Sequence, residues 1–455
     1  MGSEILILIE AVFIIGLILF FIINKDFTYG IYIWLLLILF FKYQKISVMD
    51  SILPDISLDR MLFVFLIIVF IIEILARKRK VFSLTKVECS MFLFCLFAVI
   101  SMIWTGSIVK EGGKLAIGEL LTGYIVPFFI FFISQNVYDN SSKREGFLKF
   151  IILVGVYLSF TAIFEHLRIN KLIFPKYILD TDFGIHFGRA RGPFGQAAVN
   201  GTVLGFVFSA IFYFLFNSDK WKMWRLYSML LLVITPLAVF FTYTRAAWLG
   251  AVSSFTIISL VIFRQSWKVF AVIAIIFFIV AFFVAPFFLD YNTMAFAHER
   301  MHQKSPVYER LGLYAAYINM FISNPIFGVG FTKFSDNAPD YFLDVSMENI
   351  SFQYTELKEH DTFAVVLAEM GIIGIALILV IYGSILLTSI KLYKNLRLYN
   401  LQAKSMVIIF WGCMAVYIIN SVFIQMRYFE FVNSIFFIFA GLIYRMGREY
   451  DVKAC

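Results

Sequence analysis

The feature that most constrains this chain is a series of long apolar runs that recurs along its whole length. Thirteen runs stand out, near residues 5–24, 27–41, 60–76, 88–104, 116–135, 147–165, 198–217, 226–243, 246–263, 269–288, 361–389, 405–424 and 429–444. A helix of about twenty apolar residues crosses the hydrocarbon core of a bilayer, where backbone hydrogen bonds must be satisfied within the protein. We therefore expect an all-α, polytopic bundle of about 12–13 transmembrane helices.

The composition excludes several other classes of protein. Hydrophobic residues make up 61% of the chain and charged residues 15%, whereas a soluble domain has about 45–50% and about 25%. A soluble enzyme, a disordered chain and a disulfide scaffold are therefore excluded. The four cysteines show no metal-binding spacing. Because no repeat or linker divides the sequence, we expect residues 1–455 to form a single integral-membrane domain.

The distribution of basic residues predicts which loops share a side of the membrane. Twenty of the 38 Lys and Arg residues lie in alternate loops, near residues 77–86, 143–149, 220–225, 264–268, 391–404 and 445–453. The positive-inside rule assigns these loops to the cytoplasm. The same loop bias, together with anionic headgroups, explains the net charge of +8 without a nucleic-acid partner.

The two long connections, residues 166–197 and 289–360, then lie outside the cytoplasm. Loops of this length between membrane helices commonly carry function. All five histidines fall on this outer side: His166, His186, His298, His302 and His360. The second loop also contains a helical pattern with Leu311, Tyr314, Ile318 and Phe321 on one face, stopped by Asn324-Pro325. This pattern predicts an amphipathic helix at the membrane interface.

Arg245 is the most anomalous charge, because Thr244-Arg245 alone separates two apolar runs. An Arg near the membrane interior costs about 2.5 kcal/mol or more on insertion scales. It therefore needs an anionic partner or a wet cavity. The alternative is an interfacial Arg whose side chain snorkels to the headgroups.

Three further positions could carry chemistry. Arg189 and Arg191 lie in a Gly-rich turn before the span at 198, where guanidinium groups and backbone N–H groups could bind phosphate; an ordinary tight connector is the alternative. Arg310 lies at the border of the amphipathic face, near headgroup depth, with snorkelling again the alternative. His360 lies between two carboxylates and could act as a general base, or could simply be solvated.

Glu369, inside the next span, should face the bundle interior. We interpret Asp180-Thr181-Asp182 as a loop coincidence and predict no metal.

Taken in order, four motifs resemble those of the O-antigen ligase and polymerase superfamily of bacterial membrane glycosyltransferases. They are Arg-x-x-Gly-Pro-Phe-Gly-Gln at 189–196, Tyr-Thr-Arg-Ala-Ala-Trp-Leu-Gly at 243–250, Arg310 followed by Asn-Pro-Ile-Phe-Gly-Val-Gly at 324–330, and His360 followed by Glu369-x-Gly371-x-x-Gly374. The resemblance covers roughly residues 185–380, and it implies a GT-C-like fold of about twelve spans in the bacterial cytoplasmic (inner) membrane.

The resemblance also implies a reaction. The donor would be an undecaprenyl-diphosphate-linked glycan, with Arg189, Arg191, Arg245 and Arg310 binding the lipid diphosphate and His360 acting at the glycan acceptor. Guanidinium groups can stabilise a departing diphosphate, so we expect a metal-independent, inverting transfer without a cofactor. His360, Arg191 and Arg245 are the predicted catalytic residues. Membrane lipids and a chain-length regulator are the further partners expected.

Two alternatives to a polysaccharide polymerase stay open at this point. An O-antigen ligase would transfer the glycan to a lipid A-core acceptor, and the residues do not separate the two. A lipid-linked-oligosaccharide flippase would need charged or broken helices at the bilayer midplane. The uninterrupted apolar runs and the charges gathered on the outer side favour the enzyme.

Overall fold

The computed structural model describes residues 25–41, 45–46, 56–79, 81–108, 116–217, 222–262, 305–341, 359–396 and 400–454. Within these residues the fold is all-α, as predicted, apart from an antiparallel pair of two-residue strands, β1 (Lys45–Ile46) and β2 (Ile56–Ser57). The helices are α2 (Phe27–Phe41), α3 (Leu58–Leu75), α4 (Lys86–Trp104), α5 (Ile117–Leu120), α6 (Val126–Val137), α7 (Ser141–His166), α8 (Ala197–Phe216), α9 (Lys222–Phe241), α10 (Arg245–Ile262), α14 (Ser305–Ser323), α15 (Phe334–Tyr341), α16 (Thr362–Asn395), α17 (Leu401–Ser421) and α18 (Glu430–Ala454).

The described residues confirm a polytopic membrane protein. Eight of their helical segments are long and apolar enough to cross a membrane, and α2 and α10 are shorter apolar helices. The predicted spans at 5–24 and 269–288 lie outside the described residues. The other predicted spans each fall on a helix. One of them, at 116–135, consists of α5 and α6 joined by a π-helical turn, η1 (Leu121–Ile125).

The helix ends follow from local chemistry. Thr85 and Glu88 form a reciprocal capping box at the start of α4, which satisfies two otherwise unpaired backbone N–H groups. Asn140 caps α7 by accepting from the backbone nitrogen of Lys143 at 2.9 Å. Inside α16, Gly371 has φ +60, so the two halves of this helix meet at a kink.

α8 and α18 form the centre of the bundle, and most of their length is buried. α18 packs on α6, while α8 packs against α9, α10 and α17. α8 approaches its neighbouring helices closely along Gly201-xxx-Gly205. A Cβ on Gly201 would lie 2.4 Å from the Cβ of Ala247, and one on Gly205 would lie 2.7 Å from Val416. Small residues here let the helix backbones approach.

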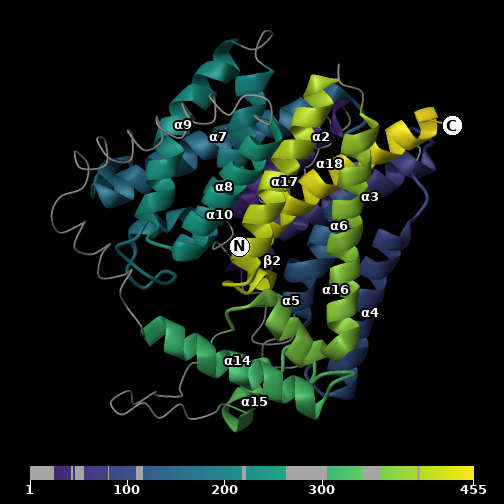
Figure 1. Ribbon diagram of the computed structural model, residues 1–455, viewed down its shortest axis with the longest axis vertical. Coiled ribbons are helices and arrows are strands. Elements are labelled where there is room, and N and C mark those ends of the chain that lie inside the picture. The colour runs from purple at the N-terminus through teal and green to yellow at the C-terminus, as the bar shows by residue number, and fades with distance from the viewer. Residues whose placement is uncertain are drawn as a thin grey trace, which may run out of the picture.

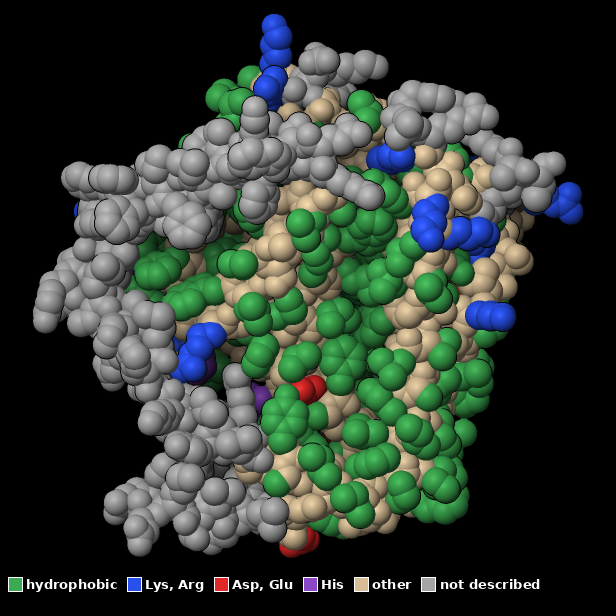
Figure 2. Space-filling view, viewed as in Figure 1, with side chains coloured by type: hydrophobic (Ala, Val, Ile, Leu, Met, Phe, Trp, Pro, Cys, Tyr) green, Lys and Arg blue, Asp and Glu red, His purple; other side chains and the backbone are tan. Residues whose placement is uncertain are grey.

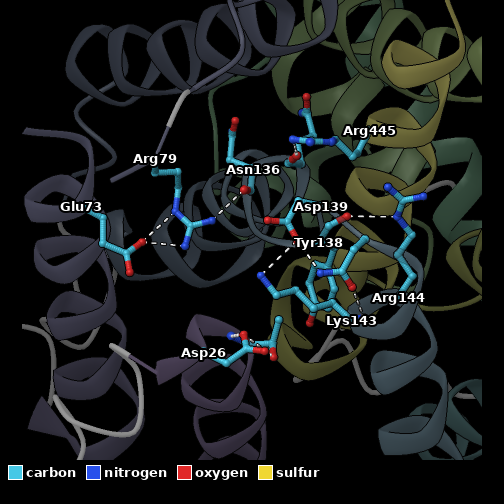
Figure 3. Close-up of polar contacts among 12 residues, drawn as sticks. Asp26, Glu73, Arg79, Asn136, Tyr138, Asp139, Lys143, Arg144 and Arg445 are labelled. Atoms are coloured by element: carbon cyan, nitrogen blue, oxygen red, sulfur yellow. Dashed lines mark hydrogen bonds and ion pairs between the residues drawn. The ribbon is translucent and has the colours of Figure 1, made fainter. Parts of the chain in front are cut away.

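The two ends of the bundle differ in charge. At one end, the Arg79 guanidinium donates to the backbone oxygen of Asn136 at 2.8 Å, and Arg144 donates to the backbone oxygen of Tyr138 at 3.0 Å (Figure 3). Arg144 also pairs with Glu449, 2.5 Å away on α18. The basic regions near residues 77–86, 143–149 and 445–453 therefore meet at one end of the bundle. This agrees with the prediction that alternate loops share one side of the membrane. On the face shown in Figure 2, most Lys and Arg side chains lie in the upper part of the view.

α14 and α15 lie across the opposite end of the bundle (Figure 1). The predicted amphipathic helix is α14, and its buried face consists of Leu313, Ala316, Tyr317 and Met320, which pack against α15 and α16. Ile318 is 52% exposed. The start of α16, which follows His360, packs against α14 at this end.

Candidate functional site

The Gly-rich turn before α8 is organised around the Arg191 side chain. Arg191 is 1% exposed. Its guanidinium donates to the backbone oxygens of Ile178 at 3.0 Å and Asp180 at 2.9 Å, and also to that of Phe183. Arg191 thus fastens residues 178–183 of the first long loop to the turn before α8. Its predicted role in binding diphosphate stays a prediction.

Glu165, at the end of α7, binds the same turn from the other side. Its carboxylate accepts from the backbone nitrogens of Arg191 at 3.3 Å and Gly192 at 2.9 Å. Gly192 has φ +56 and can turn these N–H groups inward without a Cβ penalty. The backbone groups expected to bind phosphate therefore already bind a carboxylate of the chain itself.

The turn between α9 and α10 lies directly against this Gly-rich turn. The backbone nitrogen of Ala190 donates to the backbone oxygen of Phe241 at 3.0 Å, and the His166 ring stacks on Phe241 with centroids 3.9 Å apart. Arg245 is the first residue of α10 and is exposed, while the neighbouring Arg189 is half-buried. The fold therefore brings Arg189 and Arg245 to the same region from different segments. We refer to residues 188–195 and 242–245 together as the arginine turns.

His360 lies in a second group of residues, at the start of α16. Its backbone nitrogen donates to the Tyr317 hydroxyl at 3.3 Å. The next residue, Asp361, caps α16 by accepting from the backbone nitrogens of Phe363 and Ala364 at 2.8 and 2.9 Å. Its other carboxylate oxygen accepts from the Tyr314 hydroxyl at 2.6 Å. The backbone of His360 is thus fixed between α14 and α16.

Beside His360 lies a buried charge cluster centred on Arg427. Arg427 belongs to the short helical turn η8 (Met426–Tyr428) between α17 and α18, and its side chain is 1% exposed. It pairs with Glu369 at 2.6 Å, Glu119 at 3.2 Å and Glu359. Burial lowers the pKa of Arg427, but the Glu359 and Glu369 carboxylates outweigh this effect and hold that pKa well above its usual value. The guanidinium is therefore permanently charged.

The Asn-Pro-Ile-Phe-Gly-Val-Gly motif docks on the kink of α16. The backbone nitrogens of Val329 and Gly330 donate to the backbone oxygens of Ala368 and Glu369 at 3.0 and 2.9 Å. A Cβ on Gly371 would lie 2.4 Å from the backbone oxygen of Ile326. The glycines of both motifs thus permit direct backbone contact. Glu369 faces the interior, as predicted, and also accepts from the backbone nitrogen of Phe334 at 3.2 Å.

The start of α18 connects the two groups of residues. Phe431 of α18 contacts Phe194 of the Gly-rich turn, with ring centroids 5.4 Å apart, while Arg427, one turn earlier, contacts Glu359. In Figure 2, basic and histidine side chains gather at mid-height on the left, near an acidic side chain and apart from the basic upper end.

Arg310 lies in α14, but its side chain is outside the described part of the structure.

Arg427 and Glu165 are site residues that the sequence analysis did not single out. Arg427 lies in a short break between two apolar runs, which is the same signal that identified Arg245. The burial cost of a charge could therefore have pointed to it. Glu165 carries no comparable signal, because it lies at the end of α7 next to the first long loop and not in a short break between two apolar runs. Among the described residues, no three His, Cys, Asp or Glu side chains are grouped so as to hold a metal ion.

Comparison with protein families places a known domain over part of this region. Residues 230–379 match the family model described as O-antigen ligase. This segment includes Arg245, Arg310 and His360 but not the motif at 189–196, and over the residues that it covers it confirms the predicted resemblance to the O-antigen ligase and polymerase superfamily. It supports a membrane glycosyltransferase. No curated protein matches the chain.

Proposed function

We propose that this chain, which carries an O-antigen ligase family segment, transfers a glycan from an undecaprenyl-diphosphate carrier at the outer face of the bacterial cytoplasmic membrane. The observation that carries the proposal is the meeting of the two arginine turns at the end of the bundle opposite the basic loops. Arg189 lies in the turn before α8, and Arg245 is the first residue of α10. Two guanidinium groups at a membrane boundary suit a lipid-linked diphosphate.

The reaction needs a leaving group, a nucleophile and a proton acceptor. An acceptor hydroxyl forms a bond to the anomeric carbon as the bond from that carbon to the diphosphate oxygen breaks, with inversion. The proton passes to His360, and undecaprenyl diphosphate leaves with its charge stabilised by Arg245 and Arg189. Arg191 adds a buried positive charge beneath the turn, and Arg310 of α14 completes the proposed set. No step requires a metal or cofactor.

We assign the acceptor to a second lipid-linked repeat, which makes the protein a polysaccharide polymerase. A ligase that uses a lipid A-core acceptor is the second candidate. Both reactions use the same donor and the same arginine turns.

The test uses the full-length protein in lipid nanodiscs with a purified undecaprenyl-diphosphate-linked oligosaccharide. A ladder of longer lipid-linked products, unchanged by EDTA and inverted at the new linkage, is the expected result. Transfer only to an added lipid A-core would instead identify a ligase. Movement of the lipid across vesicles without any new glycosidic bond would identify a flippase and overturn the proposal.

A further inference from the structure

The geometry points to Arg427 and its neighbours in η8 as the element that positions His360 for proton transfer, an inference that rests on the proposed function. Neither Arg427 nor η8 lies in the segment matched to the O-antigen ligase family. Arg427 is a positioning residue here, because it contacts the segment that bears His360 and has no assigned contact with substrate.

The first link runs through Glu359, the residue immediately before His360. The Arg427 guanidinium pairs with the Glu359 carboxylate, and the Tyr428 hydroxyl donates to the same carboxylate at 2.9 Å. Gln425 adds a longer contact to it at 3.5 Å. Three residues of η8 and its flank therefore bind the Glu359 side chain, and both Glu359 and Arg427 are almost fully buried.

The second link runs through Thr362, two residues after His360. Its hydroxyl donates to the backbone oxygen of Ile424 at 2.8 Å and accepts from the backbone nitrogen of Met426 at 2.9 Å. His360 is consequently held on both sides by the segment 424–428. Its own backbone nitrogen is held by Tyr317 of α14.

The segment that holds His360 is itself rigidly seated. Asn433 of α18 donates to the backbone oxygens of Met426 at 2.8 Å and Gly123 at 3.3 Å. Gly123 lies in the π-helical turn η1, where a Cβ would come 2.7 Å from the backbone oxygen of Arg427. π-helical turns often occur at functional sites. α18 and the π-helical turn η1 therefore hold η8 in place by direct contact.

The charge balance argues that this cluster does more than stabilise the fold. One guanidinium faces three carboxylates, those of Glu119, Glu359 and Glu369. Buried ion pairs often stabilise a protein no better than well-packed apolar residues, so such a cluster is weak evidence for a stability role alone. A general base, in contrast, must be held within about 0.5 Å of its productive position. The cluster restrains the chain on both sides of His360, through Glu359 and Thr362.

The test compares mild variants of the positioning contacts. Tyr428→Phe and Thr362→Val each remove hydrogen bonds and leave all three ion pairs in place, while Arg427→Lys keeps the charge but cannot bridge three carboxylates. Arg445→Lys is the matched control, because Arg445 pairs with Glu449 at 2.6 Å at the opposite end of the bundle. Each variant is studied in nanodiscs, with thermal unfolding to verify that it is folded.

Two readouts are needed. The first is turnover of the lipid-linked donor, alone and combined with His360→Gln. The second is the rate at which diethyl pyrocarbonate modifies His360, followed by mass spectrometry, which requires no enzymatic activity. We expect the three variants to lower kcat roughly tenfold to hundredfold with little change in donor KM, the scale of an approximately 1 Å misplacement.

In the His360→Gln background the same variants should cause almost no further loss, because they act through His360. They should also change the modification rate of His360, whereas Arg445→Lys should change neither readout. Full turnover and an unchanged modification rate in folded Tyr428→Phe and Thr362→Val would overturn the inference. An altered modification rate, with His360→Gln itself fully active, would preserve the positioning role and reject His360 as the base of the proposed reaction.

Discussion

The Glu165 carboxylate accepts a hydrogen bond from the backbone nitrogen of Gly192, with 2.9 Å between oxygen and nitrogen. This contact joins the end of α7 to the turn that carries Arg189 and Arg191. A carboxylate of the chain itself therefore fills the backbone anion site of the turn.

Replacing Glu165 with Gln should loosen the arginine turns. An amide keeps one acceptor oxygen but presents an N–H group to a backbone donor, and an unsatisfied buried group costs about 1–3 kcal/mol. We expect a lower unfolding temperature together with reduced turnover. Glu449→Gln, at the other end of the bundle, should lower stability without lowering turnover. Wild-type stability and turnover in Glu165→Gln would contradict the role given to this contact.

Removing Arg245 should abolish activity and leave the fold intact. A cation at a helix N-terminus is opposed by the helix dipole, typically by about 0.3–1 kcal/mol. Arg245→Ala should remain folded, which thermal unfolding in nanodiscs verifies. Arg245→Lys should also lose most turnover, because an ammonium group cannot bind diphosphate in a bidentate manner.

Lys86→Ala is the matched control for Arg245, since Lys86 is likewise the exposed first residue of a membrane helix but lies at the basic end. It should retain full turnover. Near-normal turnover of Arg245→Ala with a lipid-linked donor would remove Arg245 from the proposed site.

The kink of α16 should not tolerate a side chain. Gly371→Ala places a Cβ 2.4 Å from the backbone oxygen of Ile326 at a residue with φ +60. The docking of the Asn-Pro-Ile-Phe-Gly-Val-Gly motif should then fail, with a loss of roughly 1–3 kcal/mol from backbone strain alone. Thermal unfolding measures this loss. Gly383→Ala, in the same helix with no atom within 4 Å of the added Cβ, should be neutral or slightly stabilising; equal effects of the two variants would refute the argument.

Asp361 should matter for the helix cap and for the attachment of α14. Asp361→Ala removes the acceptor of two backbone N–H groups and of the Tyr314 hydroxyl, and loss of a cap costs about 0.5–2 kcal/mol. Asp361→Asn should keep most of this stability, because an amide oxygen also caps a helix. Proteolysis of α14 in nanodiscs should be faster in Asp361→Ala than in Asp361→Asn. Similar rates in both variants would show that the cap does not secure α14.

The membrane helices follow from the amino-acid sequence alone, because lipid leaves an apolar segment few ways to satisfy its backbone hydrogen bonds. The α-helices at 88–104, 147–165 and 405–424 follow from this rule with little dependence on the rest of the chain. The cost of a charge near the membrane interior made Arg245 a candidate, and the structure has it exposed at the start of α10. Apolar periodicity predicted α14. Which face of α14 packs on the protein could not be predicted, because lipid and protein interior both accept apolar side chains.

Which polar groups pair with one another depends on how the helices pack. It paired Arg427 with Glu119, Glu359 and Glu369, which lie far apart in the chain, and it directed the Arg191 guanidinium to backbone oxygens. The physical reason is that hydrophobic burial depends on composition and can be read locally, whereas a buried charge is stabilised only by partners at particular distances and angles. Those partners come together only when the helices pack.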